Sequence, residues 1–232
     1  MGYSLSWIAV KERPDSEIHR SLGLKKTGEY GDYYGKHRIV GRVLKNGWYI
    51  LIAQGCDDPI TKSRALASLS KSCEAVACSI EEHVMFSSCA FWKNGKKAWS
   101  VKHRGEEGPL DILKTGKLPQ NYASIERGLV ETQKSEDNEG EGVDHVFDLP
   151  LVMAKQLVGF RHDESPSEPD DGAYQILELN YQQRISRTIR AIIPWAYLLG
   201  VLALFGILMV AFAEVAHWTL DWLFKSAKHF VS

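Results

Sequence analysis

The chain has 232 residues, of which 44% are hydrophobic and 25% are charged, and its formal net charge is −1. This composition suits one globular domain with an appendage. The first 180 residues hold 23 basic and 27 acidic side chains, whereas the last 52 hold five basic and two acidic ones. A mildly acidic domain lacks the clustered basic face that nucleic acid requires, so we expect no nucleic-acid partner.

The chain opens with an expected strand, in which apolar residues alternate with serines (YSLSW). The opening has neither the basic start nor the long apolar core of a secretory signal, so we expect none. It also fits the acylation pattern M-G-x-x-x-S at Gly2, but the strand is the favoured interpretation. A helix is predicted next, because Asp15 can cap the segment SEIHRSLGL, which ends near Gly23.

Two β-hairpins are predicted around the dipeptides Asn46-Gly47 and Asn94-Gly95, each of which lies between two apolar runs. Asn-Gly supplies the positive φ angles of a type I′ turn. The run from Trp48 to Ala53 is almost wholly apolar, which indicates a central strand that is covered on both faces.

Three further helices are predicted. One is RALASLSKS, preceded by Thr61 or Ser63, and the others cover residues 123–133 and 149–158, the last beginning near Pro150. Hairpins joined by helices predict an α+β domain over residues 1–180, with a mostly antiparallel sheet and helices on one side. We also expect a short strand between the last two helices, and polar loops at residues 134–144 and 161–172.

The C-terminal part contains residues 191–213, twenty-three in a row without a charge. At ~1.5 Å per residue they reach about 34 Å, enough to cross the hydrocarbon core of a bilayer. We therefore predict one transmembrane helix there, between a basic segment at 181–190 and an amphipathic aromatic tail at 214–232. The alternative is a buried core helix, which usually shows a polar stripe that is missing here. The residues expected to anchor the chain are basic or aromatic: Arg184, Arg187, Arg190, Trp195, Tyr197, Trp218 and Trp222.

The arginines before the predicted span place the N-terminal domain in the cytoplasm by the positive-inside rule, and we expect a bacterial inner membrane. The four cysteines form no C-x-x-C pair and lie in apolar surroundings, which indicates reduced thiols and agrees with that location. Ala196 and Gly200 form a small-xxx-small pair, a motif for self-association through the span.

The first candidate site is the sequence QGCDDP, where Cys56, Asp57 and Asp58 follow a buried strand. A cysteine beside carboxylates could act as a nucleophile if a base lay close to it. The structural alternative, which we favour, is that Asp57 or Asp58 caps the next turn before Pro59.

Histidines define two further candidates. His83 could approach His103 across the second hairpin, but pairing Lys93 with Lys96 places His103 opposite Phe86, too far from His83 to share a metal. We therefore predict no metal and no cofactor. The third candidate joins two surface segments by their histidines and carboxylates, for which solvent-exposed loops are the favoured interpretation: Asp144, His145, Asp148, His162, Asp163 and Glu164.

The motifs of serine hydrolases, zinc proteases and nucleotide-binding proteins are all missing from the sequence. We therefore expect an interaction module, held at the cytoplasmic face of a membrane, that recognises a protein partner. A toxin-neutralising protein and an accessory protein of a membrane machine both fit that class. The alternative is a membrane-tethered hydrolase with its site near Cys56, Asp57 and Asp58.

Overall fold

A computed structural model describes residues 2–33, 37–139, 142–164 and 173–180, together with the isolated positions 203, 206, 208, 209 and 212. The chain forms two units, Met1–Asn180 and Tyr181–Ser232, and the strands and helices below belong to the first. No helix within the described residues is both long and apolar enough to span a membrane. The predicted basic segment and tail, and the predicted span except for the five isolated positions, lie outside the described residues.

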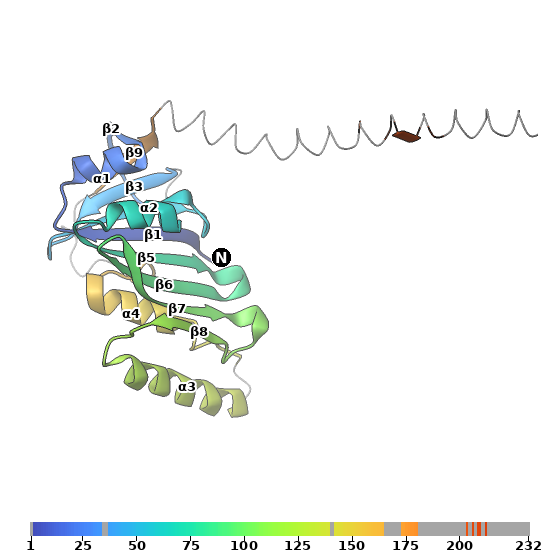
Figure 1. The fold of residues 1–232 in the computed structure, drawn as a ribbon. Coiled ribbons are helices and arrows are strands. Elements are labelled where there is room, and N and C mark those ends of the chain that lie inside the picture. Colours follow the sequence, from blue (N-terminus) through green and yellow to red (C-terminus); the bar gives the residue numbers. More distant parts are fainter. Residues whose placement is uncertain are drawn as a thin grey trace, which may run out of the picture. The chain divides into compact units, whose positions relative to one another are not determined.

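The first unit is an α+β domain built on one antiparallel sheet (Figure 1). Among the described residues the strands are β1 (Ser4–Lys11), β2 (Leu24–Gly31), β3 (Ile39–Val43), β4 (Trp48–Gln54), β5 (Glu74–Glu81), β6 (Phe86–Lys93), β7 (Lys96–Arg104), β8 (Ile112–Gly116) and β9 (Tyr174–Leu179). Their order is β2-β9-β3-β4-β1-β5-β6-β7-β8, and every neighbouring pair is antiparallel. The last strand in the chain therefore lies between the second and the third.

In the described part of the first unit, four α-helices pack on this sheet: α1 (Asp15–Leu22), α2 (Ser63–Leu69), α3 (Tyr122–Glu139) and α4 (Asp148–Val158). Short 3-10 turns are η1 (Pro59–Thr61), η2 (Glu82–Val84) and η3 (Gly105–Glu107). The predicted helices are thus confirmed in place. The third runs through residues 134–139, which we had predicted as a loop, and no strand separates α3 from α4 in the part of that connection that the structure describes.

Helices cover both faces of the sheet, so the prediction of helices on one side was wrong (Figure 1). One core contains Trp7 of β1 and Leu149 of α4, and the other contains Ile8 of β1 with Ile18 of α1. Successive residues of a strand point to opposite faces, so β1 and β4, whose inner residues are buried on both faces, need cover on both sides. The apolar run from Trp48 to Ala53 is buried throughout, as predicted.

The two Asn-Gly turns differ in type. Asn94 (φ 54) and Gly95 (φ 72) both have positive φ, as the predicted type I′ turn requires. At the first turn only Gly47 (φ 83) does, and its N–H donates to the carbonyl oxygen of Leu44 at 2.9 Å. That geometry is a type I turn followed by a G1 bulge, so the type I′ prediction was wrong for this hairpin.

The second hairpin begins in the predicted register and then departs from it. Lys93 pairs with Lys96, as expected, but the register shifts by one residue between Trp92 and Phe91. His103 consequently lies opposite Ser87 and not opposite Phe86. A β-bulge adds one unpaired residue to one strand, which sequence spacing does not reveal.

Candidate binding site

A hollow of about 770 Å³ lies at the end of the β3–β4 hairpin. Its walls come from the end of β3, the hairpin turn, the start of β9, part of β2 and the segment after α4. The aromatic residues that line it are Tyr30, Tyr33, Tyr49, Phe160 and Tyr174. The basic residues that line it are Lys26, Arg42, Lys45, Lys155 and Arg161, and the acidic ones are Asp15 and Glu164. The volume falls within the ordinary range of ligand pockets, and the lining combines apolar rings with positioned charges.

Tyr49 reaches the hollow because Gly41 leaves room for it. A Cβ at Gly41 would overlap the Tyr49 hydroxyl and come within 2.8 Å of Leu51 Cδ2. The Tyr49 hydroxyl is hydrogen-bonded to Nε2 of buried His19 at 2.6 Å. Burial lowers the pKa of His19, and it raises the pKa of Tyr49. This pair therefore stays neutral near pH 7 and acts as a fixed polar wall.

Three of the cations around the hollow are held by an aromatic ring or by a carboxylate. Arg42 lies over the ring of Tyr174, with 4.5 Å between Cζ and the ring centroid. Lys26 pairs with Asp15 at 2.7 Å, and Lys155 pairs with Glu164 at 2.6 Å. Both lysine pairs are partly exposed, so each contributes little to stability, about 0–1 kcal/mol.

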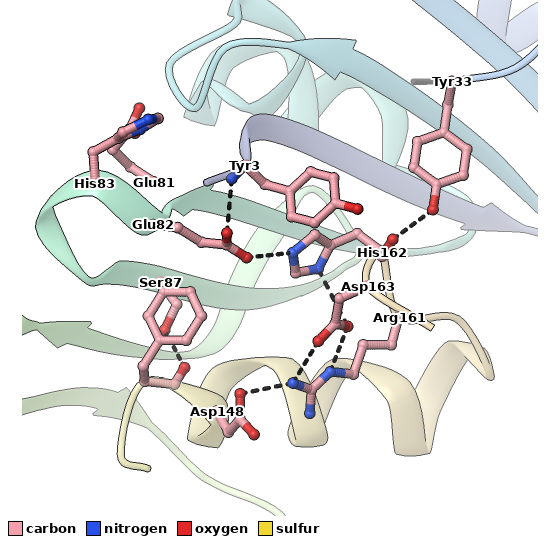
Figure 2. Close-up of polar contacts among 11 residues, drawn as sticks. Tyr3, Tyr33, Glu81, Glu82, His83, Ser87, Asp148, Arg161, His162 and Asp163 are labelled. Carbon is pink, nitrogen blue, oxygen red and sulfur yellow. Dashed lines mark hydrogen bonds and ion pairs between the residues drawn. The ribbon is translucent and has the colours of Figure 1, made fainter. Parts of the chain in front are cut away.

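The segment after α4 is fastened by a charged network (Figure 2). Arg161 donates to both carboxylate oxygens of Asp163, at 2.7 and 2.8 Å, and to Asp148 at 2.7 Å. Burial alone would lower the pKa of Arg161 and raise that of Asp163, but the hydrogen bonds and charges between them reverse both shifts. The network fixes Arg161, which lines the hollow, against the first turn of α4.

His162 extends this network to the start of β1 (Figure 2). The side chain is only 1% exposed, and its Nε2 lies 3.4 Å from Oε1 of Glu82. Glu82 also accepts a hydrogen bond from the backbone N–H of Tyr3 at 2.7 Å, and the Tyr33 hydroxyl donates to the His162 carbonyl oxygen at 2.5 Å. Burial lowers the pKa of His162 against the opposing effect of Asp163 and Glu82. A histidine so enclosed supports the wall of the hollow and does not face solvent.

In the first candidate site from the sequence, the Asp58 carboxylate has a structural role in a turn. Asp58 is only 4% exposed, its Oδ1 accepts from the N–H of Ile60 at 3.1 Å, and its Oδ2 lies 3.4 Å from Arg38. Asp58 is thus the N-cap of η1, which is the alternative that we favoured. Asp57 forms an exposed ion pair with Lys62.

Cys56 and His83 belong to two different candidates, and both lie beside Glu81, which precedes His83 by two residues in the sequence. Glu81 is hydrogen-bonded to the Cys56 thiol, and its Oε1 lies 2.6 Å from Nδ1 of exposed His83. Burial raises the pKa of Cys56, and the charges of Glu81 and Asp57 raise it further. The thiol therefore ionises less readily than an ordinary cysteine, the opposite of what a nucleophile needs. All four cysteines are free.

The remaining candidate histidines, His103 and His145, have different partners. His103 is fully buried, with Nε2 2.8 Å from Asp144 and Nδ1 2.9 Å from the carbonyl oxygen of Asp111. Asp144 is therefore separate from the network that holds Asp148. His145 pairs with Glu136. No group of three His, Cys, Asp or Glu side chains among the described residues could hold a metal ion.

Reasoning from the sequence missed the hollow. Its residues carry no motif, and Arg42 and Tyr174, which form its cation–aromatic contact, are 132 positions apart. The local signals were FRHDE, which contains Arg161, and the basic bias between Lys25 and Lys45, which is more typical of a solvated edge. The predicted anchoring residues, from Arg184 to Trp222, lie outside the described residues.

Comparisons of the chain with protein-family models, with curated proteins and with solved structures found no match. The functional argument therefore depends on the residues and their geometry.

Proposed function

We propose that this chain is a recognition protein that binds a protein partner through the hollow at the β3–β4 hairpin. The observation that carries the proposal is the exposure of two large apolar side chains at that place. Tyr30 is 64% exposed and Val43 is 65% exposed, and both line the hollow. Exposed apolar side chains, tyrosines and arginines are residue types that are enriched where proteins bind one another.

The surroundings of the reactive side chains favour recognition over catalysis. Cys56 has a raised pKa, His162 is enclosed by protein, and Asp58 caps a turn. The contact of Glu81 with both Cys56 and His83 is the one observation that favours the alternative, a hydrolase. That function needs a base that withdraws the thiol proton, whereas a neighbouring carboxylate stabilises the thiol against ionisation.

A membrane anchor belongs to the same proposal. It is supported by the twenty-three uncharged residues at 191–213 and by the three arginines directly before them. The anchor would hold the recognition domain at the cytoplasmic face. Protease treatment of sealed vesicles tests that orientation, because we expect digestion of residues 1–180 only from the cytoplasmic side.

Site-specific photo-cross-linking tests the partner. A photoreactive amino acid is placed at Tyr30 or Val43 of the full chain in its source cells, and at Leu113 as the control. Leu113 on β8 is an apolar side chain that is also exposed, at 45%, but it does not line the hollow. We expect one protein adduct of defined mass from Tyr30 and Val43. The same adduct from Leu113, or none from the hollow, would contradict the proposal.

A further inference from the structure

We infer that the hollow takes an acidic segment of the partner protein, one in which carboxylates alternate with apolar side chains. This inference rests on the proposed function and names the chemistry of the ligand. Its main support is the charge of the walls. Among the described residues, five basic and two acidic side chains line the hollow, and the Asp163 and Asp148 carboxylates lie against Arg161, so the local balance is +1 in a chain whose net charge is −1.

The local charge acts strongly because of where it lies. Tyr33, Phe160 and Tyr174 form apolar walls between the cations, and all three are buried. A cleft in which one sign of charge predominates, with walls of low dielectric constant, concentrates its field on the ligand. An anionic group entering the hollow therefore gains more than it would at a flat surface with the same charges.

Two of the cations can exchange their partners at small cost. Lys26 and Lys155 are each paired with a carboxylate that also lines the hollow. Both partners of each pair are partly exposed, so breaking the pair costs about 0–1 kcal/mol. A carboxylate from a partner can replace Asp15 or Glu164 without leaving a buried charge unpaired.

The geometry of Arg42 favours a carboxylate in particular. Its guanidinium lies over the Tyr174 ring, which limits the freedom of a long side chain before any ligand binds. A guanidinium presents its N–H donors in a planar fork that matches the two oxygens of a carboxylate. Exposed Tyr30 and Val43 beside it provide contact area for the apolar side chains of the same segment.

Arg161 has a different part in this arrangement. Its donors are directed to Asp163 and Asp148, and the three side chains form one compact network (Figure 2). These two carboxylates offset its charge, so Arg161 makes the wall rigid and is not expected to change partners. Lys45 lies on the exposed hairpin turn and lines the hollow, so it is the residue of choice for a test.

The test measures the binding of labelled peptides to the full chain in neutral-lipid nanodiscs by fluorescence anisotropy. Three peptides of equal length alternate Leu with Glu, Gln or Lys. The test variant is Lys45→Glu, and the matched control is Lys97→Glu, the same charge reversal at an exposed position of β7 outside the hollow. We expect the Glu peptide to bind most tightly and to bind more weakly as salt rises.

We expect Lys45→Glu to weaken binding of the Glu peptide by roughly fivefold, as the reversal of one exposed charge does, with a change under about twofold for Lys97→Glu. Equal binding of the Gln and Glu peptides, or equal effects of the two reversals, overturns the inference. Displacement of the peptide by inorganic phosphate alone at millimolar concentration also overturns it, because the hollow would then be a site for small anions.

Failure of this inference is distinguishable from failure of the proposed function. Suppose that a partner cross-links at Tyr30 and Val43 while its binding is unchanged by salt and by Lys45→Glu. In that case the proposal of a protein partner is supported, and the inference that it binds through an acidic segment is overturned. If no partner cross-links while the peptide pattern holds, the hollow's preference for an acidic segment stands and the protein partner fails.

Discussion

His162 lies enclosed between Glu82 and Asp163, and its pKa lies below the ordinary value of about 6.5 because burial disfavours the imidazolium. The opposing carboxylates reduce this shift without reversing it. His19 has its pKa lowered by burial in the same way, beside Tyr49. The folded protein therefore binds protons at these two rings less readily than the unfolded chain does.

This difference predicts a loss of stability in weak acid. The contribution is fully present above pH 6.5 and is lost as the pH falls from there toward the folded-state pKa values, with a slope of up to about 1.4 kcal/mol per pH unit for each ring. Chemical denaturation between about pH 7.5 and 5.5 measures it. We expect His162→Gln to lower stability at pH 7.5 and to flatten the slope, since one of the two rings is removed.

The control for that experiment is Lys97→Gln, which removes an exposed charge far from both rings in the sequence. It should keep the wild-type slope. A slope that is the same in His162→Gln and in the wild type would show that His162 does not cause the acid sensitivity.

At the scale of elements, we expect the change of glycine to alanine to have opposite effects on stability at Gly116 and at Gly128, which lie in neighbouring elements. Gly116 ends β8 with φ +78, and a Cβ there would overlap the carbonyl oxygen of Ala98 and lie 2.8 Å from Trp99 Cα. Gly128 lies within α3, and a Cβ there would meet nothing within 4 Å. At Gly116 the space for a Cβ is occupied by backbone atoms, which cannot rotate away as a side chain can. At Gly128 that space is empty.

We therefore expect Gly116→Ala to destabilise the domain by more than about 2 kcal/mol, because positive φ and backbone overlap add. Gly128→Ala should stabilise it by up to about 1 kcal/mol, since alanine favours the helix. The midpoints of urea denaturation measure both changes. Destabilisation by Gly128→Ala would mean that α3 is not a continuous helix at that position.

The elements that the sequence predicted are those specified by local chemistry. The Asn94-Gly95 turn and the apolar strand from Trp48 to Ala53 follow from residues within a few positions of each other. The edge strands β2 and β8 were missed, because most of their side chains are exposed and neither shows the alternation of a half-buried strand. The bulge between Phe91 and Trp92 left no sequence signal and displaced His103 by one residue.

The hollow could not be predicted for a reason of topology. It exists because β9, at the end of the domain, pairs with both β2 and β3, which brings Tyr174 beside Arg42. No local pattern states that a C-terminal strand inserts near the beginning of the sheet. The buried N-cap Asp58 shows the converse, since its role depends only on the residues that follow it.

At the scale of the whole molecule, the unit Met1–Asn180 contains two cores, one on each face of a sheet whose central strands are covered on both sides. A unit with its own cores is expected to fold without the residues that follow it. The sequence from 191 to 213 supplies no polar stripe with which it could form part of a water-exposed core helix. The two observations together favour a separable domain and an anchor.

Truncation after Asn180 tests this division. We expect the truncated chain to stay in the soluble fraction after an alkaline carbonate wash and to unfold cooperatively, whereas the full chain stays with the membrane pellet. A double variant of the full chain, Leu204→Arg with Ile207→Arg, is the control, because each arginine near the centre of a span costs about 2.5–3.5 kcal/mol on insertion. This variant should leave the membrane while its domain keeps the melting temperature of the truncated chain. If carbonate releases the unmodified full chain and the truncated chain aggregates, residues 191–213 are a buried core helix and the division into domain and anchor is wrong.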